Sequence, residues 1–273
     1  YQDGSEGKID IGQSFETTYE MFQGKDPRFL ASIYVPGSSL LGSTMQFQRG
    51  LILKDGSKYY AQSAPGPSYL LETYIDPETQ RKDTIFGKDG GTYTGDASKT
   101  GFNIRKFVNE NLKTEAQWDF GKTETSFPIF RLAEVYLNLA EAAVEMGKYQ
   151  TEAFEAIKKI RDRAGVVTPF AVVDVEKVRH ERQVELAFEG HRFWDMKRWR
   201  IAHLPVDQGG LNGFRGAGLH PFFDLRIRKY VFEVANDLPK RQRVFTEKNY
   251  YTKFSGNDMN SNPSLIQNPE FLN

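Results

Sequence analysis

Hydrophobic residues recur every three or four positions over three stretches in the second half of the chain. The stretches are 128–146, 151–164 and 174–189, and they are followed by Gly147, Gly165 and Gly190. Glycine is favoured at the left-handed position that ends many helices. The first stretch has two apolar stripes, so we expect it to be buried on two sides. The pattern therefore predicts a mainly α fold that begins with a helix pair.

Polar residues at the starts of these stretches can cap the helices. Ser126 is the expected cap of the first helix, with Pro128 near its first turn, where a missing N–H is tolerated. Asp174 is expected to cap the third helix, because its carboxylate can accept hydrogen bonds from amides near Lys177. Aromatic residues after Gly190 predict that a further helix begins there.

The parts of the chain on either side of this region have little helical periodicity. Residues 1–127 are rich in Gly, Ser, Thr, Tyr and Asp, which indicates loops with short β-strands and a candidate ligand face. The helical core is assigned to 128–204. Residues 205–273 are predicted to pack on that core as an irregular segment. Within it we expect a glycine-rich loop over 209–218, a β-prone run at 230–235, and an extended tail.

Acidic and basic residues alternate at helical spacing near the end of the third predicted helix. Glu181, Glu185 and Glu189 fall on one helical face at four-residue steps. Arg179 and Arg182 lie beside them and are expected to keep the carboxylates ionised. The general acid of a glycoside hydrolase needs a raised pKa instead. The pattern therefore favours a charge lattice that stabilises the helices over a catalytic carboxylate pair.

The same stretch resembles the signature of the SusD/RagB family of nutrient-uptake proteins. The matching positions are Glu181-Arg182, Glu185-Leu186, Phe188-Glu189-Gly190, Arg192, Trp194-Asp195 and Arg198-Trp199. Further stretches resemble the family in the right order, and they are Thr100–Phe102, Arg105–Phe107, Phe127–Ala142, Asn262-Pro263 and Gln267–Pro269. The likeness runs from about Lys25 to the C-terminus. It departs at 253–257, where the family has a Pro-Ile-Pro turn, and at Glu270, which replaces a glycine.

The predicted helix pair also resembles one tetratricopeptide unit. The residues at matching spacings are Tyr136, Leu139, Ala140, Ala143, Gly147 and Tyr149. Ala153 comes one residue late, and no second clear copy follows at a period of about 34 residues. Together the two resemblances imply a SusD-like fold, in which a tetratricopeptide-like helix pair and further helices accompany a large loop-rich region with short strands.

The family resemblance implies a non-catalytic protein that binds glycan and delivers it to a SusC-like TonB-dependent transporter. It also implies a lipoprotein on the outer surface of the outer membrane. In the family a leader, a lipid-bearing cysteine and an N-terminal helical half precede a region like this one, so the chain is expected to be a C-terminal piece. A peptide-binding member of the family and a tetratricopeptide-type adaptor for a protein partner remain as alternatives.

Charge and composition narrow the kinds of partner. Lys plus Arg and Asp plus Glu each number 36, so no net charge attracts nucleic acid or an anionic membrane. No apolar run approaches the roughly 20 residues of a membrane helix. The family resemblance implies membrane attachment only through an N-terminal lipid anchor, which is expected to be absent from this C-terminal piece. The absence of cysteine excludes disulfides and thiolate chemistry.

The motifs for metals and cofactors are incomplete. His180 and Glu181 begin like the zinc-protease motif H-E-x-x-H, but Val184 occupies the place of the second histidine. The glycine-rich runs at 87–91 and 209–218 lack the Gly-Lys-Ser/Thr of a phosphate loop. We therefore expect no catalytic residue, no metal and no cofactor.

Aromatic residues in the irregular first part are the candidate ligand contacts. A sugar ring stacks its C–H face on an aromatic ring while its hydroxyls need hydrogen-bond partners. The candidates are Trp118, Tyr59, Tyr60, Tyr69, Tyr74 and Tyr93. Trp118 is the strongest, since amide and carboxylate side chains flank it. Trp194 and Trp199 are expected to be structural because they lie in the helical signature.

Overall fold

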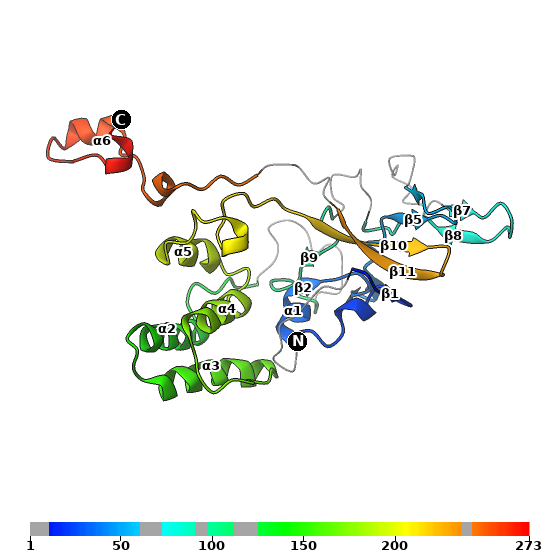
Figure 1. The fold of residues 1–273 in the computed structure, drawn as a ribbon, viewed down its shortest axis with the longest axis horizontal. Helices are drawn as coiled ribbons and strands as arrows, with labels where there is room; N and C mark the ends of the chain where they lie inside the picture. Colours follow the sequence, from blue (N-terminus) through cyan, green and yellow to red (C-terminus); the bar gives the residue numbers. More distant parts are fainter. Residues whose placement is uncertain (1–10, 61–72, 91–97, 112–124, 236–241, 273) are drawn as a thin grey trace. The chain divides into compact units, whose positions relative to one another are not determined.

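The computed structural model of the chain describes residues 11–60, 73–90, 98–111, 125–235 and 242–272. The chain divides into two compact units. The first comprises Tyr1–Glu189 and Ala217–Leu238, and the second comprises Gly190–Gly216 and Pro239–Asn273. Figure 1 labels helices and strands of both units. The three-part division predicted from composition stays a prediction.

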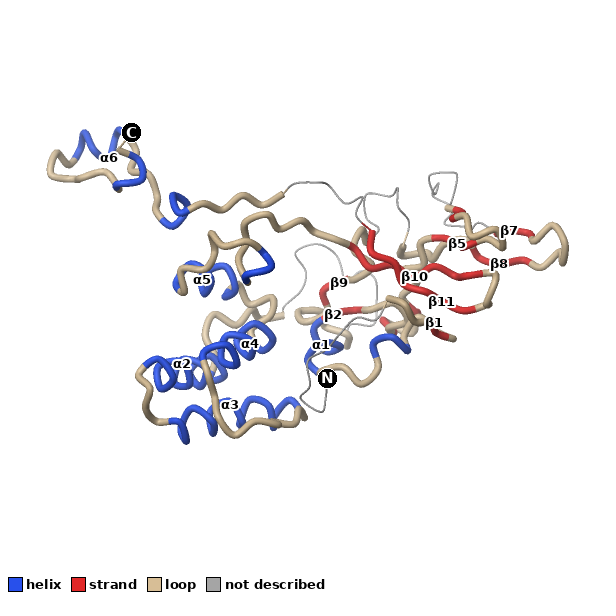
Figure 2. Tube along the Cα trace, viewed as in Figure 1, coloured by secondary structure: helices blue, strands red, loops and turns tan. Residues whose placement is uncertain are grey.

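A five-stranded sheet is the largest β structure of the first unit (Figure 2). Its order is β1 (Ser14–Phe15), β11 (Lys229–Ala235), β10 (Gly218–Asp224), β5 (Gly50–Ile52) and β6 (Lys58–Tyr59). β10 pairs antiparallel with β11 and parallel with β5. A Cβ added to Gly50 would lie 2.5 Å from the Tyr59 carbonyl oxygen, so glycine is required where β5 meets β6.

The sequence predicted part of this sheet. The β-prone run at 230–235 is β11, which confirms that prediction. β10 begins at Gly218, directly after the predicted loop, and it was not foreseen. Pro221 lies within β10, and proline usually argues against a central strand. Burial of almost every residue of β10 also removes the alternation of polar and apolar positions that signals a strand.

Three two-stranded sheets and a short helix accompany the large sheet. The sheets pair β2 (Ile33–Tyr34) with β9 (Asn103–Ile104), β3 (Ser39–Leu40) with β4 (Ser43–Thr44), and β7 (Thr73–Ile75) with β8 (Lys82–Thr84). The helix α1 covers Pro27–Ser32, and the Asp26 side chain accepts a hydrogen bond from the Arg28 amide at its start. Loops with short strands therefore fill the described part of 1–127, as predicted.

Three helices of the first unit share one hydrophobic core. They are α2 (Leu132–Glu145), α3 (Gln150–Ala164) and α4 (Val175–Glu185). Each helix contributes buried residues to this core, for example Leu137 of α2, Ile157 of α3 and Val178 of α4. Gly147 and Gly165 have φ of 63° and 69°, so both adopt the left-handed conformation expected of them. The predicted helix pair is confirmed, and its assignment as a tetratricopeptide unit stays a prediction.

Two helix boundaries differ from the prediction. Ser126 does not cap α2, which begins at Leu132 after an extended Arg131. α4 is capped by Asp174, as predicted, but it ends at Glu185 instead of Glu189. This early end frees backbone carbonyls that a longer helix would use internally. The carbonyls of Glu185 and Ala187 accept hydrogen bonds from the Lys106 ammonium.

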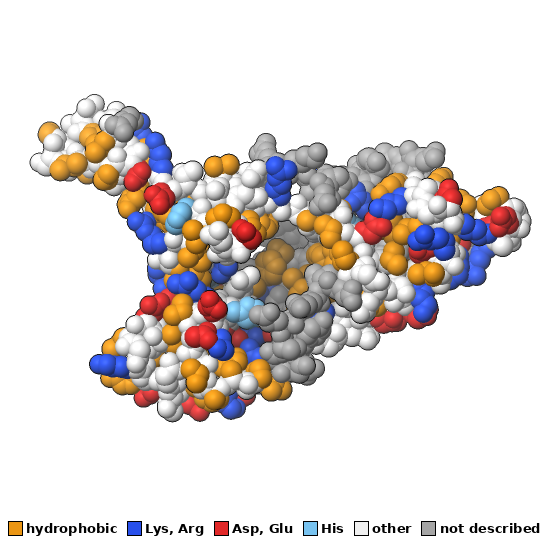
Figure 3. Space-filling model, in the orientation of Figure 1, with side chains coloured by type: hydrophobic (Ala, Val, Ile, Leu, Met, Phe, Trp, Pro, Cys, Tyr) orange, Lys and Arg blue, Asp and Glu red, His pale blue; other side chains and the backbone are white. Residues whose placement is uncertain are grey.

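One of the two apolar stripes of α2 reaches the surface. Leu132, Leu139 and Met146 of this stripe are 63%, 47% and 58% exposed. The other stripe includes Leu137 and Ala140, which are fully buried against the neighbouring helices. Ala143 of the first stripe is nevertheless buried, so the burial on two sides that the stripes predicted is found only in part. Figure 3 shows hydrophobic side chains on the surface of the part that contains α2 and α3.

The second unit is built from short helices. They include α5 (His191–Arg198), α6 (Gly256–Ser261) and 3-10 turns at Val206–Gln208, Glu247–Tyr250 and Pro269–Phe271. Met196, Ala202 and Phe245 form its buried cluster. The further helix predicted after Gly190 is therefore confirmed. The extended tail was a wrong prediction, because Ser255 and Asp258 form a capping box that starts α6.

Candidate functional site

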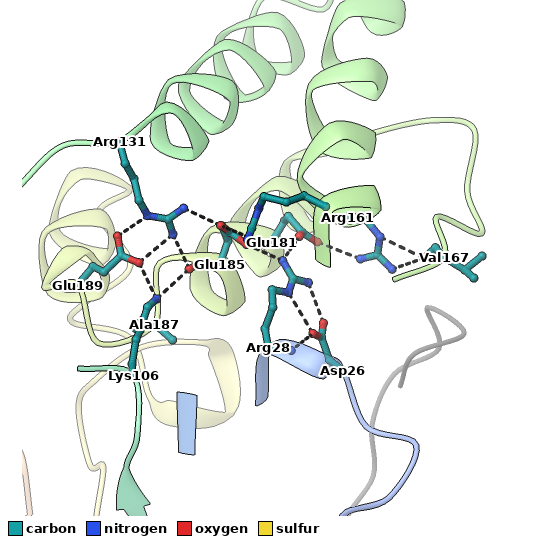
Figure 4. A network of polar contacts seen from close by, with 11 residues as sticks. Asp26, Arg28, Lys106, Arg131, Arg161, Val167, Glu181, Glu185, Ala187 and Glu189 are labelled. Atoms are coloured by element: carbon teal, nitrogen blue, oxygen red, sulfur yellow. Dashed lines mark hydrogen bonds and ion pairs between the residues drawn. The ribbon is translucent and has the colours of Figure 1, made fainter. Parts of the chain in front are cut away.

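The three glutamates of the signature are buried and lie in a cluster with five basic residues, which we call the carboxylate cluster (Figure 4). Its members are Glu181, Glu185, Glu189, Arg28, Lys106, Arg131, Arg161 and Arg163. The basic residues come from α1, from the segment after β9, from the residue before α2, and from the end of α3. The cluster therefore ties segments far apart in the sequence to α4 and the turn that follows it.

Glu181 is the most enclosed member of the carboxylate cluster. Its Oε1 accepts a hydrogen bond of 2.5 Å from Nη1 of Arg28, and its Oε2 accepts one of 2.9 Å from Nη1 of Arg161. Its side chain is 2% exposed, and those of its two partners are 10% and 7% exposed. Arg161 also donates to the Val167 carbonyl. All three charged groups are therefore buried and paired. Removing any one of them would leave a buried charge without a partner that now offsets the cost of its burial.

Glu185 accepts hydrogen bonds from three guanidinium groups. Nη1 of Arg131 lies 2.7 Å from Oε1, and Nη2 of Arg163 lies 2.7 and 2.9 Å from the two oxygens. Arg28 completes the set at 3.1 Å from Oε2. Arg28 thus bridges Glu181 and Glu185, and so holds α1 against α4.

Glu189 joins the turn after α4 to two other segments. Nε of Arg131 donates to Oε2 at 2.6 Å, and Nζ of Lys106 donates to Oε1 at 2.5 Å. Burial alone would raise the pKa of Glu189, but the hydrogen bonds and positive charges of Arg131 and Lys106 outweigh it. The net effect lowers the pKa of this carboxyl below its usual value.

The partners of the three glutamates differ from the sequence-based expectation. Arg179 and Arg182 were expected to hold these carboxylates. Arg182 instead donates to Oδ1 of Asn138 at 2.7 Å and lies 3.9 Å from Glu141, both on α2. A carboxylate on one helix face can be paired by any basic residue packed against that face, and local spacing does not reveal those residues. The expected charge lattice is present, but most of its cations come from other elements.

Every oxygen of the three carboxylates accepts a hydrogen bond from a basic side chain. The hydrogen-bonding capacity of these oxygens is therefore directed at the protein's own basic side chains. The cluster can therefore brace the helices, and the lowered pKa of Glu189 is the opposite of what the general acid of a glycoside hydrolase needs.

Replacing Glu189 with glutamine tests the role of its ionised form. The pKa of Glu189 is lower in the folded than in the unfolded protein, so its ionisation stabilises the fold above the unfolded value of about 4.3. That stabilisation is lost as the pH falls through the folded pKa. We expect Glu189→Gln to be less stable than the wild type near neutral pH. The difference in urea midpoint should shrink as the pH falls below the unfolded value. A difference that stays constant with pH would contradict this role.

The structure describes three of the six candidate aromatic residues. Tyr59 and Tyr74 are half-buried and pack against each other, with ring centroids 5.6 Å apart. Tyr60 is 38% exposed and stands edge-on to Phe222 at 5.7 Å. The guanidinium of Arg49 lies 5.9 Å from the Tyr60 ring. Of these three tyrosines, Tyr60 is the one whose ring is exposed enough to stack with a ligand. Trp118, Tyr69 and Tyr93 lie outside the described residues.

Two cavities adjoin the carboxylate cluster. The first has a volume of about 420 Å³ and lies beside Arg131 and Glu189, with Phe107 and Pro128 in its wall. The second has a volume of about 560 Å³. Its lining residues are Pro27, Leu30, Ala31, Arg105, Lys106, Val108, Asn109, Glu110 and Asn111. Amide, carboxylate and guanidinium groups dominate the second cavity, and such groups pair with sugar hydroxyls.

No group of three or more His, Asp or Glu side chains in the described ranges is placed to hold a metal ion. Likewise, no helix within those ranges is long and apolar enough to cross a membrane.

The fold and the cluster define a class of protein in which a helical core is braced by buried ion pairs to a loop-rich part with short strands. The sequence model of the SusD family matches residues 1–271. The chain belongs to the SusD family, and the resemblance noted in the signature is thereby confirmed.

Individual relatives are similar over shorter stretches. Two curated proteins described as SusD-like, both from Formosa agariphila, are 31% identical over 101 residues and 39% identical over 80 residues. These matches cover 33% and 27% of this chain but only 20% and 15% of the relatives. The crystal structure of a SusD-like carbohydrate binding protein from Bacteroides fragilis has a similar fold, with a TM-score of 0.58 and 23% identity. That match covers 97% of this chain and 46% of the other.

Proposed function

We propose that this chain is a non-catalytic glycan-binding component of a nutrient-uptake system in the outer membrane. Membership of the SusD family carries this proposal. The fold shared with a carbohydrate binding protein is consistent with it. The ligand would be held by stacking and hydrogen bonds, and we propose no catalytic residue, metal or cofactor.

The carboxylate cluster supports the proposal of binding without cleavage. Its glutamates are occupied by basic side chains, which leaves them no role as acid, base or nucleophile. We propose that they hold the helical core together while other residues contact the glycan.

We propose that the glycan contacts lie in the loop-rich part. Tyr60 offers an exposed ring, and Arg49 beside it can donate hydrogen bonds to sugar hydroxyls. Asn109 and Asn111 bring further amides to the wall of the second cavity. Trp118 follows these two asparagines closely in the sequence, and this proximity to the second cavity's lining residues supports Trp118 as a further candidate. Tyr69 and Tyr93 remain candidates on their sequence context, whereas the rings of Tyr59 and Tyr74 pack against each other and are half-buried.

We further propose that the protein is lipid-anchored at the outer surface of the outer membrane and works with a SusC-like TonB-dependent transporter. The family resemblance supports both statements. Modest affinity would suit this role, because the glycan must leave the binding protein to enter the transporter.

Affinity electrophoresis tests the glycan site. We expect one class of neutral polysaccharide to retard the wild-type protein. Tyr60→Ala and Trp118→Ala should each weaken that retardation by about tenfold, equivalent to about 1.4 kcal/mol of binding free energy. Loss of a stacking ring removes both apolar contact and orientation of the sugar.

Tyr149→Ala is the matched control, because Tyr149 is a tyrosine of 56% exposure that lies outside the loop-rich part, directly before α3. It should leave retardation unchanged. Thermal melts must show that all variants unfold cooperatively. Equal weakening by Tyr149→Ala would contradict the proposed location, and no retardation by any glycan would contradict glycan binding.

A further inference from the structure

The helix α5 of the second unit presents aromatic and basic side chains together at the surface. Trp194 is 66% exposed and Phe193 is 43% exposed. The Lys197 ammonium lies 5.6 Å from the ring centroid of each. Trp194 was expected to be structural, so its exposure is unforeseen. Hydrophobic and basic side chains adjoin in the region of α5 in Figure 3.

A row of aromatic rings continues from α5 across the second unit. Phe193 contacts the buried Phe245 at 6.3 Å, and Phe245 contacts Tyr250 at 5.1 Å. The guanidinium of Arg200 lies over this row, 4.4 Å from the Tyr250 ring and 5.3 Å from the Tyr251 ring. We call this surface the α5 face, and its members are the exposed residues Phe193, Trp194, Arg200 and Tyr251 together with the half-buried Lys197.

Arg200 is held in place by its backbone and by one hydrogen bond. Its φ of 57° is unusual for a residue with a side chain, and its Nη2 donates to the Tyr251 hydroxyl at 2.8 Å. A guanidinium that stacks on an aromatic ring keeps its N–H groups in the plane, directed away from the ring. Arg200 can therefore pair with an anion at the edge of the aromatic row.

The charge of the second unit favours an anionic ligand. The unit contains ten Lys and Arg but five Asp and Glu, whereas the whole chain has 36 of each. Among the described residues, no carboxylate lies within ion-pair distance of Lys197 or Arg200. One exposed acid, Glu247, is close enough to add to the electrostatic stabilisation of the Arg200 cation. Positive charge thus gathers beside exposed rings in a chain that is neutral as a whole.

We propose that the α5 face binds an acidic polysaccharide. The C–H faces of its sugar rings stack on Trp194 and Tyr251, and its carboxylate or sulfate groups pair with Lys197 and Arg200. Stacking requires a ring-shaped ligand, and the flanking cations require a negative charge on that ligand. This inference rests on the proposed glycan binding, and it adds a second contact surface and a ligand class.

The test compares polygalacturonate with the same polymer after methyl esterification, which removes the charge and keeps the sugar backbone. We expect polygalacturonate to retard the full chain strongly in affinity electrophoresis, and the ester to retard it weakly. Lys197→Gln, Arg200→Gln and Trp194→Ala should each weaken binding to polygalacturonate by about tenfold. Glu247→Gln should strengthen it, because it removes a negative charge near Arg200.

Lys253→Gln is the matched control, because it removes one exposed positive charge from the same unit at a residue that is not a member of the α5 face. It should leave binding unchanged, and melts should show every variant folded. An arm with carrageenan, a galactan that carries sulfate but no carboxylate, identifies the anion: retention that depends on Lys197 supports the proposal with sulfate as the paired group.

Three results would overturn the inference. One is equal weakening by Lys253→Gln, which would indicate nonspecific charge attraction. Another is binding of double-stranded DNA that is as tight as the binding of polygalacturonate and depends equally on Lys197 and Arg200. The third is binding of a neutral glycan through Tyr60 with no binding of any acidic one, which would leave the proposed function standing. Failure to bind either kind of glycan would overturn the proposed function as well.

Discussion

Replacing Glu181 with alanine is expected to lower the free energy of unfolding by about 3 to 5 kcal/mol. The substitution leaves Arg28 and Arg161 charged, buried and without the carboxylate that now pairs with both. Since small proteins have total stabilities of about 5 to 15 kcal/mol, this loss is a large fraction of the whole. Urea unfolding followed by circular dichroism measures it as a shift of the midpoint at constant slope.

Asp162→Ala is the control for this prediction. Asp162 also pairs with a basic residue, Lys158, but both side chains are exposed and lie one helical turn apart on α3. Exposed pairs of this kind contribute about 0.5 kcal/mol or less. If Glu181→Ala costs no more than Asp162→Ala, the carboxylate cluster does not brace the fold.

Replacing Gly101 with alanine is the second substitution with a large expected effect, a loss of about 3 kcal/mol or more. Gly101 has φ of 80°, and a Cβ at this position would lie 2.1 Å from the Leu219 carbonyl oxygen. The backbone would have to move away from β10, although the Leu219 amide donates a 2.9 Å hydrogen bond to the carbonyl of neighbouring Thr100. Thermal melts and urea midpoints of the purified variant measure this loss.

Gly147→Ala separates the two causes of that loss. Gly147 also has a left-handed backbone, with φ of 63°, but nothing lies within 4 Å of an added Cβ. We expect a cost of about 1 to 2 kcal/mol there, from the conformation alone. Equal losses at the two glycines would mean that the close approach of Gly101 to β10 contributes nothing.

The helices could be predicted from the sequence because their signals are local. Apolar spacing and the glycines that follow located α2 and α3, and the carboxylate of Asp174 located the start of α4. The end of α4 was missed because it depends on Lys106, which binds the freed carbonyls from a distant segment. The spacing of residues within the helix does not predict a contact with a distant segment.

The sequence predicted that the three glutamates take part in a charge lattice, but it did not predict which basic residues pair with them. Arg28 reaches Glu181 from 153 positions earlier in the sequence, and Arg161 and Arg163 reach α4 from the end of α3. Lys106 and Arg131 lie in stretches that resemble the family, and that resemblance was the one signal that could have singled them out. Arg28 has no comparable local pattern beyond its place after the capping Asp26.

The ligand contacts were harder to predict than the scaffold. Neighbouring residues Tyr59 and Tyr60 have similar sequence context, yet the first packs on Tyr74 and the second is exposed. Tyr59 is the last residue of β6 and Tyr60 follows it, and a two-residue strand is too short to reveal its end or its register from sequence. Trp194 was assigned to the interior because its motif looked helical, although a helix also has an outer face.

The most direct test of the central claim, glycan capture without cleavage, is to incubate the protein with a glycan that retards it and then size the recovered glycan by chromatography. We predict that the glycan returns with its length unchanged, and that Glu185→Gln loses stability but binds the glycan equally well at temperatures where it is folded. Shorter products that form with the wild type and disappear with folded Glu185→Gln would contradict the account and make the carboxylate cluster a reaction centre.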